Sequence, residues 1–87
     1  MIEPGAGTVR VLLFGRVREL ARVAETRVEA RPGATVDSVA AALAAGTPAL
    51  EPHLRRCSFA VNAAYADRAA PVAPGDEVAV IPPIGGG

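Results

Sequence analysis

The sequence predicts a small α+β domain of two layers, in which a single sheet carries one main helix across one face. Apolar residues form short strand-like runs at residues 8–14 and 77–81, whereas between residues 35 and 46 they recur every three or four positions, as on one side of a helix. The expected order is strand, short helix, strand, long helix, strand, small strand, strand. Because a sheet and a helix each have an apolar face to bury, packing the helix on the sheet is the economical arrangement.

The first part of the chain is expected to form two strands joined by a short helix. Residues 8–14 are apolar at most positions, which suits a central strand buried on most of both faces. Residues 16–24 change period, with apolar side chains on one helical face at Val17, Leu20, Ala21 and Ala24. Residues 26–30 alternate again, and the turn signal Arg31-Pro32-Gly33 ends this second strand.

The clearest helix follows this turn. Thr35 is suited to cap its first turn, and Asp37 sits where the helix dipole favours an acid. One apolar stripe runs along the helix at Val36, Val39, Ala40, Leu43 and Ala44. Gly46 supplies a stop signal and Pro48 lies just beyond it, so the helix is expected to end there.

The remaining elements are short. Residues 49–56 are expected to form a helical turn or a short helix, limited by a proline to first-turn geometry. Residues 58–62 are expected to form a strand, and residues 65–67 at most a short edge strand. Residues 74–76 form a turn signal, and residues 77–81 are the last strand. No repeat or linker divides residues 1–87, so we expect one domain, with residues 1–7 as a loose leader.

Composition excludes several classes of function. A chain of 87 residues buries only about 60–65% of its unfolded surface, which leaves no room for a large internal active site. Nine basic and nine acidic residues balance, so neither nucleic acid nor a membrane is an expected partner. One Cys and one His predict no disulfide and no metal site. With no signal segment and no apolar run of about 20 residues, the expected location is the cytoplasm.

The last residues are the most informative part of the sequence. Gly85, Gly86 and Gly87 follow the apolar, stiff segment Ile81-Pro82-Pro83-Ile84. Glycines lack Cβ atoms and can thread a narrow channel, as delivery of a chain end into another protein's active site requires. The terminal carboxylate is ionised above a pKa of about 3.5 and is a poor electrophile, so it needs an activating enzyme. The alternative is a frayed end without function.

Three motifs together resemble the ubiquitin-like β-grasp sulfur carriers, and within them the small sulfur-carrier subunits of molybdopterin synthase. They are Val11-Leu12-Leu13-Phe14 with Arg18-Glu19, Ala60-Val61-Asn62 with Tyr65, and residues 74–84 before the terminal glycines. The last block is the specific one, because a strand that enters Pro-Pro, a hydrophobic residue and a glycine end is uncommon. Gly85 departs from the family, which more often has a small hydroxyl residue there.

The resemblance implies a carrier cycle at Gly87. An E1-like adenylating enzyme would use ATP to convert the Gly87 carboxylate into an acyl-adenylate, and a persulfide or sulfurtransferase donor would replace AMP with sulfur. The thiocarboxylate would then enter the large synthase subunit and donate sulfur to a pyranopterin precursor. Residues 82–87 would form the inserted tail, which reaches roughly 20 Å when extended. Within it, the approach to Gly87 is made by Pro82, Pro83, Ile84, Gly85 and Gly86. The chain would bind no cofactor and would be a sulfur-donor subunit rather than an enzyme alone.

Two other classes of function remain open. Relatives of the same fold serve thiamine synthesis, tRNA thiolation or cysteine synthesis, or are conjugated to lysines as protein modifiers. A ubiquitin-like interaction module with no covalent role does not need a free Gly87. For docking to a large subunit, the sheet face that the main helix leaves uncovered is the expected surface, and we expect it to be apolar.

Other residues have simpler interpretations. Cys57 is expected to be a small, partly buried hydrophobe rather than a persulfide carrier. His53 has no partner at a useful spacing and is expected to be a solvated surface residue. Arg18-Glu19 is expected to be a solvated or weakly paired face. The aromatic residues are expected to pack in the core, although an exposed one would join an interface: Phe14, Phe59 and Tyr65.

Overall fold

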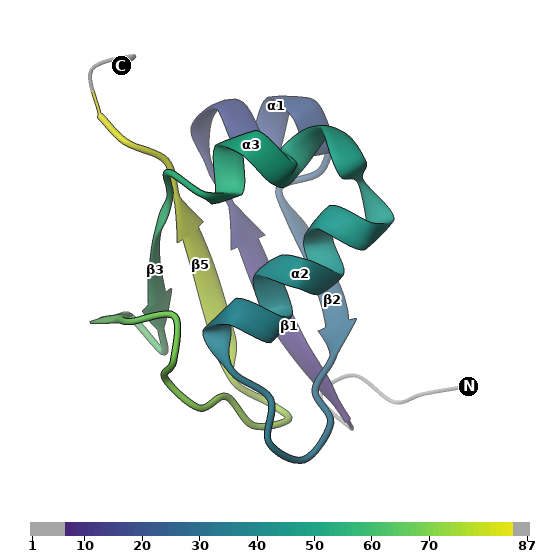
Figure 1. Cartoon of the computed structure of the whole chain (residues 1–87), viewed down its shortest axis with the longest axis vertical. Helices are drawn as coiled ribbons and strands as arrows, with labels where there is room; N and C mark the ends of the chain where they lie inside the picture. Colours follow the sequence, from purple (N-terminus) through teal and green to yellow (C-terminus); the bar gives the residue numbers. More distant parts are fainter. Residues whose placement is uncertain (1–6, 85–87) are drawn as a thin grey trace.

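The computed structural model describes residues 7–84 as a five-stranded sheet with α2 across one face and α1 and α3 at one end (Figure 1). Residues 1–6 and 85–87, which hold most of the expected leader and the terminal glycines, lie outside the described residues. The strands are β1 (Thr8–Leu13), β2 (Glu25–Glu29), β3 (Ser58–Val61), β4 (Ala64–Ala66) and β5 (Glu77–Ile81). The helical segments are α1 (Gly15–Ala21), α2 (Val36–Gly46), the 3-10 turn η1 (Pro48–Leu50) and α3 (Glu51–Leu54). The predicted α+β class is confirmed.

The sheet is mixed, with strand order β2-β1-β5-β3-β4. β1 pairs antiparallel with β2 and parallel with β5, and β3 pairs antiparallel with both β5 and β4. In the parallel pair, Leu13 at the end of β1 lies opposite Val80 near the end of β5. β1 and β5 therefore both finish at the same end of the sheet, and the start of α1 lies beside the start of the tail.

The core lies between α2 and the sheet face that it covers. Val9, Val11 and Leu13 of β1 are almost completely buried, whereas Leu12, which points to the other face, is only half-buried. The sequence predicted that this strand is buried on most of both faces, and the prediction is wrong for the face opposite α2. β5 repeats the pattern, with Val78 and Val80 fully buried. Burying such a side chain stabilises the fold by about 1.5–3 kcal/mol.

α2 begins as predicted, at Thr35. The Thr35 Oγ1 accepts a hydrogen bond from the Ser38 N–H at 3.2 Å, and the Ser38 Oγ accepts one from the Thr35 N–H at 2.9 Å. This capping box satisfies two N–H groups that a helix start otherwise leaves without partners. The helix includes Gly46 and is capped by Thr47, whose N–H donates to the Leu43 carbonyl at 2.9 Å, so the predicted stop is one residue early.

α1 differs more from its prediction. It ends at Ala21, because Arg22 adopts a left-handed backbone conformation with φ 64° and caps the helix. Ala24, predicted to lie on the buried stripe, is exposed instead. Its carbonyl accepts a hydrogen bond from the Leu13 N–H at 2.9 Å, which draws this segment into the pairing of β1 with β2. A tertiary hydrogen bond thus overrides the local helical period.

Candidate functional site

The base of the tail is where the structure places the described part of the predicted site. β5 ends at Ile81, and Pro82, Pro83 and Ile84 carry the chain away from the sheet (Figure 1). Proline fixes φ near −65°, so two in succession make a stiff segment. Ile84 is 97% exposed, an unusual position for a large apolar side chain. Gly85, Gly86 and Gly87 lie outside the described residues, so their predicted roles stay predictions.

Gly15 lies against the first proline of the tail, and sequence reasoning missed this contact. Its φ is +55°, a left-handed conformation that costs other residues energy. A Cβ atom on Gly15 would lie 3.1 Å from Pro82 Cγ, closer than such atoms normally approach. Gly15 therefore permits both the turn from β1 into α1 and the close contact with the tail. No local signal in the sequence links these two residues.

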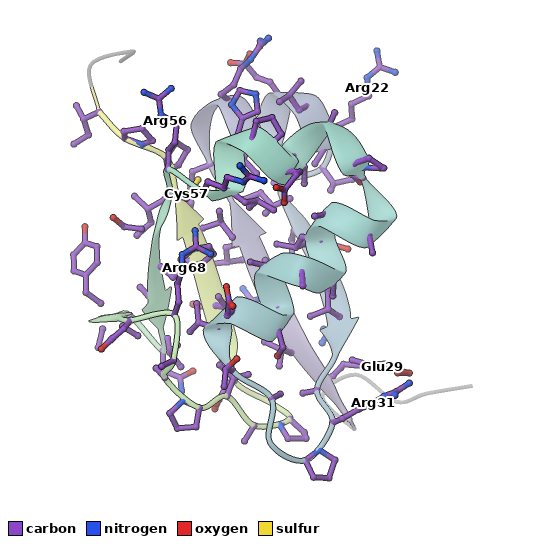
Figure 2. All side chains as sticks on the ribbon, in the orientation of Figure 1. Arg22, Glu29, Arg31, Arg56, Cys57 and Arg68 are labelled. Carbon is purple, nitrogen blue, oxygen red and sulfur yellow. The ribbon has the colours of Figure 1, made fainter. Side chains whose placement is uncertain are left out.

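A cavity of about 340 Å³ lies beside this contact. Arg16, His53 and Arg56 supply its polar lining. Its other lining residues are Val17, Cys57, Pro82 and Pro83. Figure 2 shows Arg56 and Cys57 next to the point where the chain leaves β5. His53 is half-buried where it lines this cavity, so it is less exposed than the solvated surface histidine that the sequence predicted.

Cys57 is poorly suited to carry sulfur. It is half-buried as predicted, and its thiol donates a hydrogen bond to the His53 carbonyl at 3.2 Å. Burial raises the pKa of the Cys57 thiol, and the nearby Arg68 guanidinium opposes that shift only in part. Because the thiolate is the nucleophile, a thiol held in its protonated form reacts slowly at neutral pH. Among residues 7–84, no group of three His, Cys, Asp or Glu side chains is arranged to hold a metal ion.

The sheet face opposite α2 is only partly apolar. Strand register aligns one row of apolar residues across four strands, in the order Leu12, Ala79, Ala60 and Tyr65. In the next row, Arg10 lies opposite Glu77 and pairs with it at 3.4 Å. Arg10 also pairs at 3.3 Å with Glu25, which lies opposite Leu12 at the β2 end of the first row. The expected apolar face is therefore an apolar row beside a charged one.

Two of the three aromatic residues are exposed rather than packed. Phe59 is 2% exposed and belongs to the core, as predicted. Phe14 is 45% exposed at the end of β1, and Tyr65 is 79% exposed on the edge strand β4. Their expected role in the core is wrong, and both are available to a partner. Arg18 and Glu19 are exposed as predicted, and Glu19 pairs with Arg16 at 3.1 Å.

Asn62, which contributes to the resemblance, has a structural role. It takes a left-handed φ of 49° in the β3–β4 turn. Its side-chain carbonyl accepts from the Glu77 N–H at 3.0 Å, and its side-chain amide donates to the Asp76 carboxylate at 3.1 Å. The Asp76 carboxylate also accepts from the Ala73 N–H at 2.8 Å. These bonds fix the start of β5, and hence the strand that leads into the tail.

Comparison with known proteins agrees with this geometry. Residues 11–87 match the ThiS family. The chain belongs to the ThiS family. Its resemblance to molybdopterin synthase small subunits is also confirmed, because it is 40% identical over 82 residues to the molybdopterin synthase sulfur carrier subunit of Chlamydomonas reinhardtii. That alignment covers 91% of this chain and 98% of the relative.

Solved structures of similar proteins confirm the ubiquitin-like β-grasp fold. SAMP1 from Haloferax volcanii is 30% identical with a TM-score of 0.84, over 93% of this chain and all of the other. A chain in the complex of subunits 1 and 2 of molybdopterin-converting factor from Helicobacter pylori is 25% identical with a TM-score of 0.66, over 92% of this chain and 99% of the other. Within residues 7–84, no helix is long and apolar enough to cross a membrane.

Proposed function

We propose that this protein is the sulfur-carrier subunit of a molybdopterin synthase, and that the carboxyl group of Gly87 carries the sulfur. The observation that carries the proposal is the stiff segment from Pro82 to Ile84, which leaves the sheet with an exposed isoleucine and leads to three glycines. The 40% identity to a molybdopterin synthase sulfur carrier subunit supports it. The chain supplies a deliverable carboxylate, and partner enzymes supply the chemistry.

The proposed cycle has three steps. An adenylating enzyme joins the Gly87 carboxylate to AMP and releases pyrophosphate from ATP. Sulfide attacks the acyl carbon, expels AMP and leaves the thiocarboxylate directly. A persulfide donor first forms an acyl disulfide as AMP leaves, and a thiol reductant then cleaves its S–S bond to release the same thiocarboxylate. In the large synthase subunit, that sulfur passes to a pyranopterin precursor, and water restores the carboxylate. The protonated state favoured at Cys57 supports a carrier role for the chain end rather than for this thiol.

The large subunit is expected to dock on the open sheet face and to enclose the tail. Tyr65, Phe14 and Ile84 are exposed aromatic or apolar side chains of the kind that dominate interface energies. The Helicobacter pylori structure contains two subunits of molybdopterin-converting factor, which supports a partner of this class. The adenylating enzyme and the sulfur donor are further proposed partners.

Intact-mass spectrometry tests the proposal. The protein is incubated with a matching adenylating enzyme, ATP and sulfide, and the C-terminal peptide is then mapped. We expect one oxygen at Gly87 to be replaced by sulfur. Cys57→Ala should be modified to the same extent, and deletion of Gly87 should abolish modification. Sulfur found on Cys57 instead of Gly87 would contradict the mechanism.

Conjugation to other proteins is a second candidate, favoured by one observation. The Haloferax volcanii neighbour is the small archaeal modifier protein 1, and its fold matches with a TM-score of 0.84. All nine basic residues of this chain are arginines, so a modifier of this sequence would attach to lysines of other proteins and not to a second copy of itself. Tagged protein expressed in its host should then form heavier species, stable to reducing agents, with Gly87 linked to lysine.

A further inference from the structure

We propose that the cavity beside the tail seats an acidic side chain of the large synthase subunit. The inference rests on the proposed function, because it assigns a contact to the enzyme that receives the tail. The cavity is defined above by its polar lining of Arg16, His53 and Arg56 and by Pro82 and Pro83 of the tail. Its volume of about 340 Å³ is at the small end of the roughly 300–1,000 Å³ typical of ligand pockets, a size suited to one or two side chains.

The charges around the cavity favour an anionic occupant. Among residues 7–84, two arginines line it and no carboxylate does. Arg16 has Glu19 as a partner at 3.1 Å, but no ion pair involves Arg56 among residues 7–84. A guanidinium is always charged and presents several N–H donors in a fork that fits a carboxylate.

The apolar lining strengthens such a contact. Val17 is fully buried, and Pro82 is half-buried against Gly15. A carboxylate seated among these groups is partly shielded from water, and charge-assisted hydrogen bonds are stronger in such surroundings than on an open surface.

The position of the cavity identifies the partner. Pro82 and Pro83 are at once the lining of the cavity and the base of the tail. A protein that encloses Ile84 and the residues after it therefore comes within reach of the cavity. A small substrate at the chain end is too far away, since Gly87 is four residues beyond Pro83, or roughly 14 Å along an extended tail.

Charge reversal at Arg56 tests the inference, with Arg31→Glu as the matched control. Arg31 is an exposed arginine at the opposite end of the molecule from the tail, where it pairs with Glu29 at 3.6 Å (Figure 2). Both variants change the net charge equally, so long-range electrostatic effects on binding are similar. Thermal unfolding checks that both remain folded, as expected for exposed side chains.

The readout is the dissociation constant for the large subunit, measured by calorimetry at two salt concentrations. We expect Arg56→Glu to weaken binding at least tenfold and Arg31→Glu to change it less than twofold. Arg56→Ala should weaken binding less than Arg56→Glu and reduce its salt dependence. Replacing the Asp or Glu of the large subunit that contacts Arg56 with Arg should restore binding to the Arg56→Glu variant. The same replacement should not improve binding to the parent protein.

The outcomes separate the two levels of the proposal. If the parent binds and Arg56→Glu behaves like Arg31→Glu, the inference is wrong and the sulfur-carrier function stands. If inorganic phosphate shifts the NMR signals around the cavity but Arg56→Glu leaves the complex unchanged, the cavity is a general anion site and the inference is again wrong. If the parent does not bind the large subunit at all, the proposed function fails and the inference fails with it.

Discussion

Replacing Gly15 with alanine should move the base of the tail and destabilise the fold. The residue has φ +55°, and a methyl group there would meet Pro82 Cγ at 3.1 Å, Cβ at 3.7 Å and Cδ at 3.9 Å. The left-handed conformation costs an alanine about 1–2 kcal/mol. The reduced freedom of the unfolded chain offsets about 0.4–1 kcal/mol of this cost. Pro82 must also shift by a few tenths of an ångström, so we expect a net destabilisation of about 1 kcal/mol.

Thermal unfolding and partner binding measure the two effects. In a domain of this size, 1 kcal/mol corresponds to a fall in Tm of roughly 4–8 °C. Binding to the large subunit should weaken as well, because the tail leaves the sheet at a changed angle. Gly46→Ala is the matched control, since Gly46 lies in α2, its Cβ would meet nothing within 4 Å, and alanine is the better helix former. Gly46→Ala should therefore raise Tm and leave binding unchanged.

The reasoning is refuted if Gly15→Ala melts at or above the parent temperature and binds the large subunit as tightly. Such a result would mean that the turn into α1 relaxes and that Pro82 does not depend on Gly15 for its position.

Three further predictions use other parts of the molecule. Tyr65→Ala should weaken large-subunit binding at least tenfold in calorimetry without changing Tm, because the side chain is 79% exposed. A similar loss of affinity in Val23→Ala would mean that removing any exposed apolar side chain weakens binding. Deletion of Gly87 should leave Tm unchanged, since the chain has already left the sheet at Pro82, yet give no thiocarboxylate by mass spectrometry; sulfur transfer from the shortened chain would disprove the carrier assignment. Asp76→Ala should lower the free energy of unfolding, measured with urea at neutral pH. The difference in this free energy between the variant and the parent should become smaller in acid. Hydrogen bonds from the Ala73 N–H and from Asn62 lower the folded pKa of Asp76 below its unfolded value of about 3.9. That stabilisation is therefore complete above roughly pH 4 and lost as the pH falls through the folded pKa; a difference that is constant with pH would contradict it.

The elements that sequence predicted well are those with a local cause. Thr35 caps α2 because its side chain bonds to a neighbour three residues away, and the buried stripe from Val36 to Leu43 repeats with the helical period. The turn before β5 was likewise predictable, because Gly75 has φ +91° and Asp76 bonds back to Ala73. Each of these signals lies within a few residues of the structure that it determines.

The features that sequence missed depend on contacts between distant segments. The cavity joins Arg16, His53 and Pro82, which come from three separate parts of the chain. Residues 65–67 were expected to form a short edge strand and β4 does lie at the sheet edge, but the face of the sheet that Tyr65 occupies depends on its pairing with Ala60 of β3. The contact between Gly15 and Pro82 exists only because β1 and β5 are neighbours.

The parallel pairing of β1 with β5 decides where the protein can act. Since β1 and β5 run in the same direction, α1 and the tail begin at the same end of the sheet. α3 and Arg56 lie at that end too (Figures 1 and 2). Had β5 run antiparallel to β1, the tail would leave beside Thr8, at the end of the molecule that carries Arg31. The basic cavity and the proline segment would then be separated. The direction of one strand thus brings the tail and its proposed contact with the large subunit together.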